Sequence, residues 1–164
     1  MILCCTLKLR KVLDPSENIL SDLEPSPNEW YANLIWIQGR KCLLASHAGT
    51  MFSVFAPDIR LSDIRPIGKF LVPLIEAQLD SENLDRQTFG QLDPSCVVVT
   101  STADRSVLGR MTDLALSCEY IVERDGGLKN IDLKDLHYFI QRNITNLADY
   151  QQPVKLAAEW GKED

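Results

Sequence analysis

Residues 30–55 hold the pattern that most restricts how this chain folds. Three apolar runs follow one another there, at 30–37, 41–47 and 50–55, and short turn signals separate them. Aromatic and β-branched side chains dominate the first run, and these suit a pleated, half-buried surface. Gly39 and Gly49 provide the turns, because glycine adopts positive φ without strain. We therefore predict a three-stranded antiparallel meander.

Other strands are expected on both sides of the meander. Alternate residues of the run 30–37 are apolar on both faces, which is typical of a central strand. The segment 96–100 (CVVVT) is short, continuous and β-branched, as an internal strand is. The apolar start at 1–5 is a further, shorter strand candidate.

Helical spacing appears mainly in the second half of the chain. The clearest segment follows 101–104, with Thr102 or Asp104 as its cap, and ends at Asp125-Gly126-Gly127. Asp132 caps a later helix. Apolar residues around 70–79 are also helical in period, and Pro73 predicts a start near residue 71 or a kink. We expect shorter helical segments at 7–13 and 84–92, and a surface loop over 14–28.

Together these segments predict an α+β fold. It has an antiparallel sheet of four to five strands, the meander 30–55 plus the strand 96–100, with helices packed mainly on one face. A length of 164 residues fits a single domain over 1–164. Residues 146–164 form a polar tail that Leu156, Ala157 and Trp160 could dock loosely as a short helix.

Composition excludes several classes of protein. The net charge of −6 argues against broad nucleic-acid binding, and no apolar run is long enough to span a bilayer. The five cysteines are odd in number and form no CxxC pair, so we predict free thiols in a reducing cytoplasm. The two histidines and these cysteines lack the spacing of a metal site, and we predict no metal and no cofactor.

The strand-to-helix junction at 100–110 is the predicted ligand site. A helix N-terminus attracts anions, and hydroxyls and an arginine would add further donors. The candidate residues are Thr100, Ser101, Thr102, Arg105 and Ser106, together with Arg40 and His47 at the turns of the meander. The competing interpretation is an ordinary N-cap, with Arg105 in a salt bridge to a neighbouring aspartate.

Catalysis has no comparable signature. The junction sequence TSTADRS is not a phosphate-binding loop, and the chain contains no GxSxG nucleophile motif. Ser46-His47 with a distant aspartate does not define a triad, because sequence proximity is not triad geometry. We therefore assign no catalytic residue, and whether the protein is an enzyme stays open.

Five short segments carry a resemblance to a known family. They are MILCCTLKL at the start, WYANL at 30–34, RKCLL at 40–44, TMFSV at 50–54, and RSVLG at 105–109 followed by Met111 and Asp113. In this order they resemble an uncharacterised family of small bacterial domains. The resemblance implies an accessory bacterial protein, in some cases encoded on a mobile element, and no established activity. Pro73 and residues 110–112 depart from the family pattern.

Two functions are compatible with these observations. The first is a non-catalytic binding or protein-interaction module, which could form a homodimer through an exposed apolar face. The alternative is an enzyme or binder acting on a phosphorylated or nucleic-acid ligand at the junction 100–110. An antitoxin-like accessory role would need a partner, and the sequence identifies none.

Overall fold

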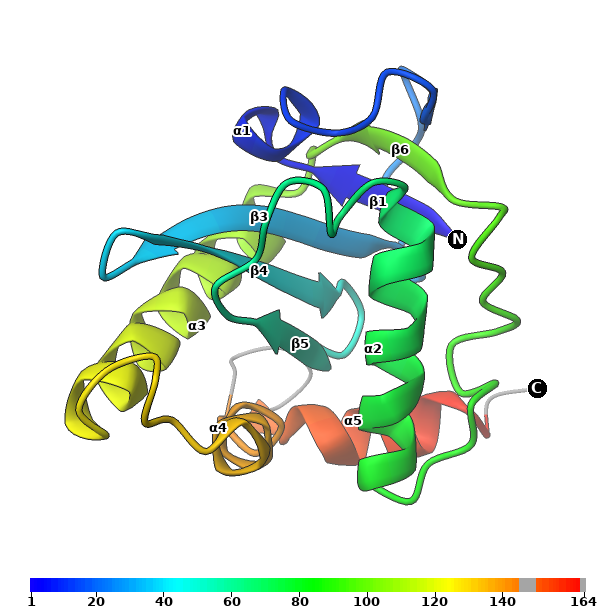
Figure 1. Cartoon of the computed structure of the whole chain (residues 1–164). Coiled ribbons are helices and arrows are strands. Elements are labelled where there is room, and N and C mark those ends of the chain that lie inside the picture. Colours follow the sequence, from blue (N-terminus) through cyan, green and yellow to red (C-terminus); the bar gives the residue numbers. More distant parts are fainter. Residues whose placement is uncertain (145–149, 163–164) are drawn as a thin grey trace.

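A computed structural model describes residues 1–144 and 150–162, and the strands among them form one mixed sheet (Figure 1). The strand order in the sheet is β2-β6-β1-β3-β4-β5. The strands are β1 (Ile2–Cys5), β2 (Asn18–Ile19), β3 (Trp30–Ile37), β4 (Arg40–His47), β5 (Ser53–Ala56) and β6 (Val98–Ser101). The helices are α1 (Leu7–Arg10), α2 (Ile67–Ser81), α3 (Arg105–Arg124), α4 (Leu133–Ile140) and α5 (Pro153–Trp160).

The predicted meander is confirmed as β3-β4-β5. Its strands pair antiparallel, from Trp30 opposite His47 to Ile37 opposite Arg40 across β3 and β4. The third strand begins at Ser53, three residues later than predicted, because the turn is longer than its Gly49 signal indicates. Met51 lies in that turn at φ 58°, a conformation that few bulky residues adopt.

The predicted α+β fold is confirmed, but the antiparallel sheet of four to five strands is only roughly right, because the sheet of the described residues is six-stranded and mixed. Strand β1 pairs parallel with both β3 and β6, and β2 pairs parallel with β6. Parallel neighbours cannot be joined by a tight turn. Helix α1, β2 and the loops around them lead from β1 to its parallel neighbour β3, and α2 with its flanking loops leads from the edge strand β5 to β6, which lies beside β1. The two-residue strand β2, inside the loop predicted over 14–28, carries no pattern that sequence analysis detects.

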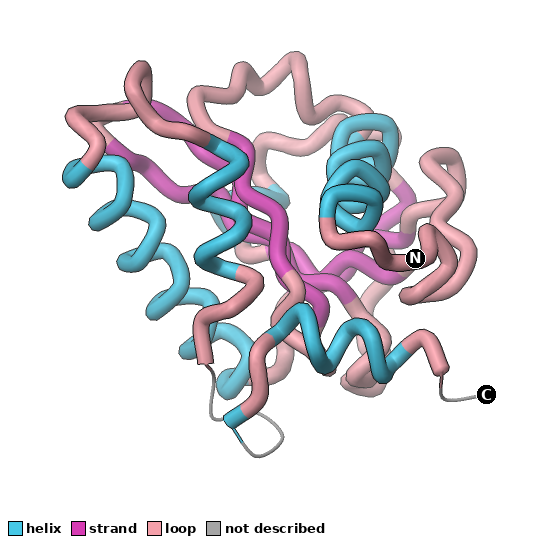
Figure 2. Tube along the Cα trace, turned by 90° about the horizontal axis from the view of Figure 1, so that it is seen from below, coloured by secondary structure: helices cyan, strands magenta, loops and turns pink. Residues whose placement is uncertain are grey.

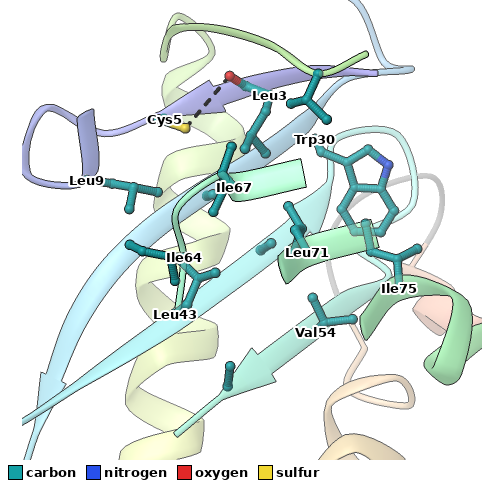
Figure 3. Close-up of a cluster of buried hydrophobic side chains, with 14 of the residues drawn as sticks. Leu3, Cys5, Leu9, Trp30, Leu43, Val54, Ile64, Ile67, Leu71 and Ile75 are labelled. Atoms are coloured by element: carbon teal, nitrogen blue, oxygen red, sulfur yellow. Dashed lines mark hydrogen bonds between the residues drawn. The ribbon is translucent and has the colours of Figure 1, made fainter. Parts of the chain in front are cut away.

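The prediction that helices pack mainly on one face is wrong. Figures 1 and 2 show helices on both sides of the sheet. Helix α2 covers one face, where Leu71 and Ile75 pack with Leu3, Leu43 and others (Figure 3). Helices α3 and α4 cover the other face, through a buried cluster that includes Cys118 and Ile140. The physical reason was already present in β3, whose two faces are both apolar.

The helix boundaries follow their caps more closely than their apolar periods. The Asp104 carboxylate accepts from the N–H groups of Ser106 and Val107, and Asp132 caps α4 in the same way. Helix α2 instead begins at Ile67 and carries Pro73 in its interior, at an exposed position where water can reach the unpaired carbonyl. Residues 84–92 form turns rather than the predicted helix.

Part of the predicted C-terminal tail forms helix α5. Ala157 is fully buried, and the Val154 N–H donates to the Gln141 carbonyl beyond α4 at 2.9 Å. Residues 145–149 and 163–164 of the predicted tail lie outside the described residues. Helix α5 therefore packs against the hydrophobic core and is hydrogen-bonded to the residue that follows α4.

Candidate functional site

After the parallel strands β1 and β6, the chain continues onto opposite faces of the sheet. After β1 it enters α1, whose Leu9 packs with the α2 cluster, and after β6 it enters α3 on the other face. In open α/β sheets such a divergence at the carboxyl ends of adjacent strands is the usual position of a ligand crevice. The predicted junction 100–110 lies at this position.

The N-terminus of α3 is already occupied by a negative charge. Asp104 Oδ1 accepts from Ser106 N at 2.8 Å and from Val107 N at 3.4 Å, and the Asp104 N–H donates to the Tyr31 hydroxyl at 3.2 Å. These bonds use backbone donors that an external anion would need. The arrangement matches the ordinary N-cap that was the competing interpretation.

The other predicted junction residues are dispersed around this cap. Thr100 is buried within β6, whereas Ser101, Arg105 and Ser106 are exposed and Thr102 is half-buried. Arg105 forms no ion pair with any residue of 1–144 or 150–162. Arg105 and Ser106 border a shallow hollow along α3 that continues toward Arg110.

Arg40 and His47 do not join the junction or each other, because they lie at opposite ends of β4. Arg40 is exposed and lies 3.8 Å from the Asp58 carboxylate. His47 is buried among aromatic rings, with Phe89 and Trp160 at centroid distances of 4.2 and 5.0 Å. Burial lowers the pKa of His47 to about 3, so its imidazole is neutral at physiological pH.

A pocket of about 330 Å³ lies beside the junction, and sequence analysis did not identify it. Segments far apart in the chain form it: α3, the β4–β5 turn, the end of α4 and the start of α5. Its lining residues are Met51, Arg110, Asp113, Leu114, Ile140, Asn143, Ile144, Tyr150 and Pro153. We call it the Arg110 pocket.

Arg110 is the polar group that distinguishes this pocket. Its Nε is buried and has no hydrogen-bond partner among the described residues. A buried guanidinium donor without a partner is unfavourable, and a bound carboxylate or phosphate oxygen would satisfy it. The Arg110 pocket and the shallow hollow share Arg110 and Asp113, so the pocket adjoins the predicted site.

The sequence contained one usable signal for Arg110. On α3 it is adjacent to the buried Met111 and one turn before the buried Leu114, so it lies at the edge of the apolar stripe. A charged side chain at such an edge is oriented partly inward. The departure from the resembled family at residues 110–112 instead placed a surface role of Arg110 in doubt.

A second cavity, of about 500 Å³, runs between α2 and α4 beside the edge strand β5. Its walls are mainly apolar and include Val54, Phe70, Leu74 and Leu133. Two side chains, one on α4 and one at its C-cap, accept hydrogen bonds from the edge strand β5. The Ser53 N–H donates to Gln141 Oε1 and the Phe55 N–H donates to His137 Nε2, each at 3.0 Å. These hydrogen bonds block the addition of another strand there.

The cysteines have no arrangement that suggests chemistry. All five are free, and Cys96 is the exposed one. Burial raises the pKa of Cys4 and of Cys118 to about 12, so both stay protonated thiols. Within residues 1–144 and 150–162, no three His, Cys, Asp or Glu side chains come together as a metal site would require.

The fold and site define a class of protein: an α+β domain whose mixed sheet has helices on both faces, with a small surface pocket at the end of α4. A family model described as a domain of unknown function, DUF6933, matches residues 2–156. The chain therefore belongs to this family. A search of curated proteins found no match. No helix in the described part of the chain is long and apolar enough to cross a membrane.

Proposed function

We propose that this domain is a non-catalytic binding module that holds a small organic anion in the Arg110 pocket. The observation that carries the proposal is Arg110, which lines the pocket and whose buried Nε has no hydrogen-bond partner within residues 1–144 and 150–162. A guanidinium binds a carboxylate through two parallel N–H donors, and its Nε edge presents such a pair. The apolar walls would bury the rest of the ligand.

The size and composition of the pocket support this function. Its volume of about 330 Å³ is at the lower end of the range for ligand pockets, roughly 300–1,000 Å³. Apolar side chains form most of the wall, and a few polar groups converge on it, as in most small-molecule sites. Neither His47 nor His137 lines the pocket, so its polar groups suit binding better than proton transfer.

The alternative, a phosphorylated or nucleic-acid ligand at 100–110, has one observation in its favour, the divergence of the chain after β1 and β6. The Asp104 carboxylate opposes it, because a phosphate at the N-terminus of α3 would meet a fixed negative charge. Arg105 would be the main cation of that site. The two sites therefore make opposite predictions for two arginines on one helix.

A binding experiment with the aromatic carboxylate 3-phenylpropanoate tests the proposal. We expect isothermal titration to detect binding, and backbone amide NMR shifts to gather around Leu114, Ile140 and Pro153. Arg110→Gln should weaken binding about 10-fold or more, because it removes a charge-assisted hydrogen bond. Circular dichroism would verify that each variant stays folded.

Arg105→Gln is the matched control, since it removes the same charge from an exposed position on the same helix. Its affinity should equal that of the wild type. If Arg105→Gln weakens binding as much as Arg110→Gln, or if the amide shifts gather at residues 100–106, the junction is the site. If 3-phenylpropanoate fails to bind at millimolar concentration, the proposed function is wrong.

The homodimer stays a prediction. Leu116 and Tyr120 lie one turn apart on α3 and are 60% and 65% exposed, so this face is where we expect a second copy to pack. Sedimentation of the wild type and of Leu116→Asp would test it. The bacterial source, the mobile-element context and the cytoplasmic location also stay predictions.

A further inference from the structure

Two opposite charges line the Arg110 pocket without neutralising each other. Arg110 and Asp113 are three residues apart on α3, where side chains of opposite sign are near neighbours and ordinarily pair. Neither forms an ion pair or a side-chain hydrogen bond within residues 1–144 and 150–162. The pocket therefore presents a separate donor and acceptor to the same ligand.

We infer, on the basis of the proposed function, that the ligand is an apolar α-amino acid whose carboxylate binds Arg110 and whose ammonium binds Asp113. An α-amino acid carries both charges on neighbouring atoms, so it can bridge two side chains that lie about one helical turn apart. Asn143, which also lines the pocket, adds a donor and an acceptor for the same head group.

The apolar part of the pocket defines the side chain of the amino acid. Met51, Leu114, Ile140 and Pro153 are buried and line the pocket, so they suit an aliphatic or aromatic group rather than a charged one. Tyr150 also lines the pocket, and its exposed ring can pack against an aromatic ligand. A volume of about 330 Å³ accommodates one such residue but not a long peptide.

Asp113 also excludes other anions. Its carboxylate repels a second negative charge near Arg110, which disfavours phosphates and dicarboxylates relative to a zwitterion. A monocarboxylate has no second negative charge, so Asp113 repels it less than it repels a phosphate or a dicarboxylate. It nevertheless leaves the carboxylate of Asp113 without a partner. Affinity should therefore decrease from amino acid to monocarboxylate to phosphate.

Three probes that share a phenyl ring test the inference: L-phenylalanine with both charges, 3-phenylpropanoate with the carboxylate alone, and 2-phenylethylamine with the ammonium alone. Titration calorimetry at low ionic strength should show L-phenylalanine binding about 3- to 10-fold more tightly than 3-phenylpropanoate. We keep this factor small because Asp113 is exposed to water.

Asp113→Asn is the decisive variant, since it removes the charge and keeps the shape. It should weaken L-phenylalanine about 3- to 10-fold and leave 3-phenylpropanoate unchanged or slightly tighter. Arg110→Gln should weaken the binding of both probes that carry a carboxylate. The control is Asp132→Asn, at an exposed aspartate that does not line the pocket and where an asparagine can still cap α4.

The outcomes separate this inference from the proposed function. Equal affinities for L-phenylalanine and 3-phenylpropanoate, with no effect of Asp113→Asn, would overturn the amino-acid assignment and keep the anion pocket. Tighter binding of 2-phenylethylamine, unaffected by Arg110→Gln, would overturn both. Binding of inorganic phosphate in place of all three probes would support the junction instead.

Discussion

At the scale of single residues, His137 shows how one side chain defines its own protonation state. Its Nε2 accepts from the Phe55 N–H at 3.0 Å, so the proton must lie on Nδ1, 2.9 Å from the Leu133 carbonyl. If Nε2 carried the proton, its N–H would face the Phe55 N–H, and two donors would oppose each other. Burial, the largest cause, lowers the pKa of His137, as it lowers that of His47.

Both histidines should make the protein less stable in mild acid. Their pKa values are about 6.5 in the unfolded chain and lower in the folded protein, so the unfolded state binds more protons as the pH falls. Their contribution is complete above about pH 6.5 and is lost progressively below it, for His47 down to its pKa of about 3. Urea unfolding between pH 7.5 and pH 5 should show this decrease.

His137→Gln separates this effect from general acid sensitivity. Glutamine still offers an acceptor to the Phe55 N–H but does not titrate, so the slope of unfolding free energy against pH should decrease. Each histidine contributes at most about 1.4 kcal/mol per pH unit. An unchanged slope in His137→Gln would show that His137 has no depressed pKa. Measurements stop at pH 5 because the carboxylates begin to titrate below it.

At the scale of elements, two helical glycines are in opposite situations. Gly68, in the first turn of α2, is buried, and a Cβ built there would collide with the Pro94 carbonyl oxygen. Gly109, in α3, is exposed, and a Cβ there would meet no atom within 4 Å. Gly68 thus allows a close approach of two backbones, whereas Gly109 only lowers helix propensity.

Replacing each glycine by alanine should change stability in opposite directions. Gly68→Ala should destabilise the protein by about 1–3 kcal/mol, because α2 must shift away from residue 94. Gly109→Ala should stabilise it by about 0.5–1 kcal/mol through a more restricted unfolded chain. Urea unfolding of both variants measures this. A stabilising Gly68→Ala would show that α2 does not pack as described.

The elements also show what the sequence could predict. The meander, β6 and the cap of α4 could be predicted from the sequence, and the cap of α3 was narrowed to Thr102 or Asp104. Each of these depends on a local pattern or on one side chain and its nearest amides. Of the two alternatives for Pro73, the start near residue 71 is wrong, because tertiary burial of Ile67 outweighed the local signal of the proline and the helix continues through Pro73. In 84–92, Phe89 and Leu92 pack against the core without forming a helix, so apolar spacing alone was misleading.

At the scale of the whole molecule, the Arg110 pocket exists only because distant segments meet. Met51 comes from the β4–β5 turn, Arg110 from α3 and Pro153 from α5. The sequence predicted a ligand site at 100–110 because that junction is a local pattern, whereas the pocket beside it depends on α3, the β4–β5 turn, the end of α4 and the start of α5 coming together. No local pattern in the sequence indicates contacts between such distant segments.

Helix α5 connects this pocket to the aromatic cluster at the other end of the helix. Its first residue, Pro153, lines the pocket, and its last, Trp160, lies 5.0 Å from the His47 ring. Gly49 has room for no side chain, because a Cβ there would overlap Trp160. The Trp160 ring therefore holds α5 in place and keeps His47 away from water.

Trp160→Ala should change three measurements together. Loss of the partly buried ring should decrease the unfolding free energy by about 2 kcal/mol, less than for a fully buried tryptophan. Water reaching His47 should raise its pKa from about 3 toward 6.5, which an NMR titration of the ring would follow. Affinity for 3-phenylpropanoate should also fall, because Pro153 is less firmly positioned.

Tyr120→Ala, which removes a 65% exposed ring, should change none of these three measurements. A Trp160→Ala protein with wild-type stability and an unchanged His47 pKa would show that α5 is not coupled to the sheet.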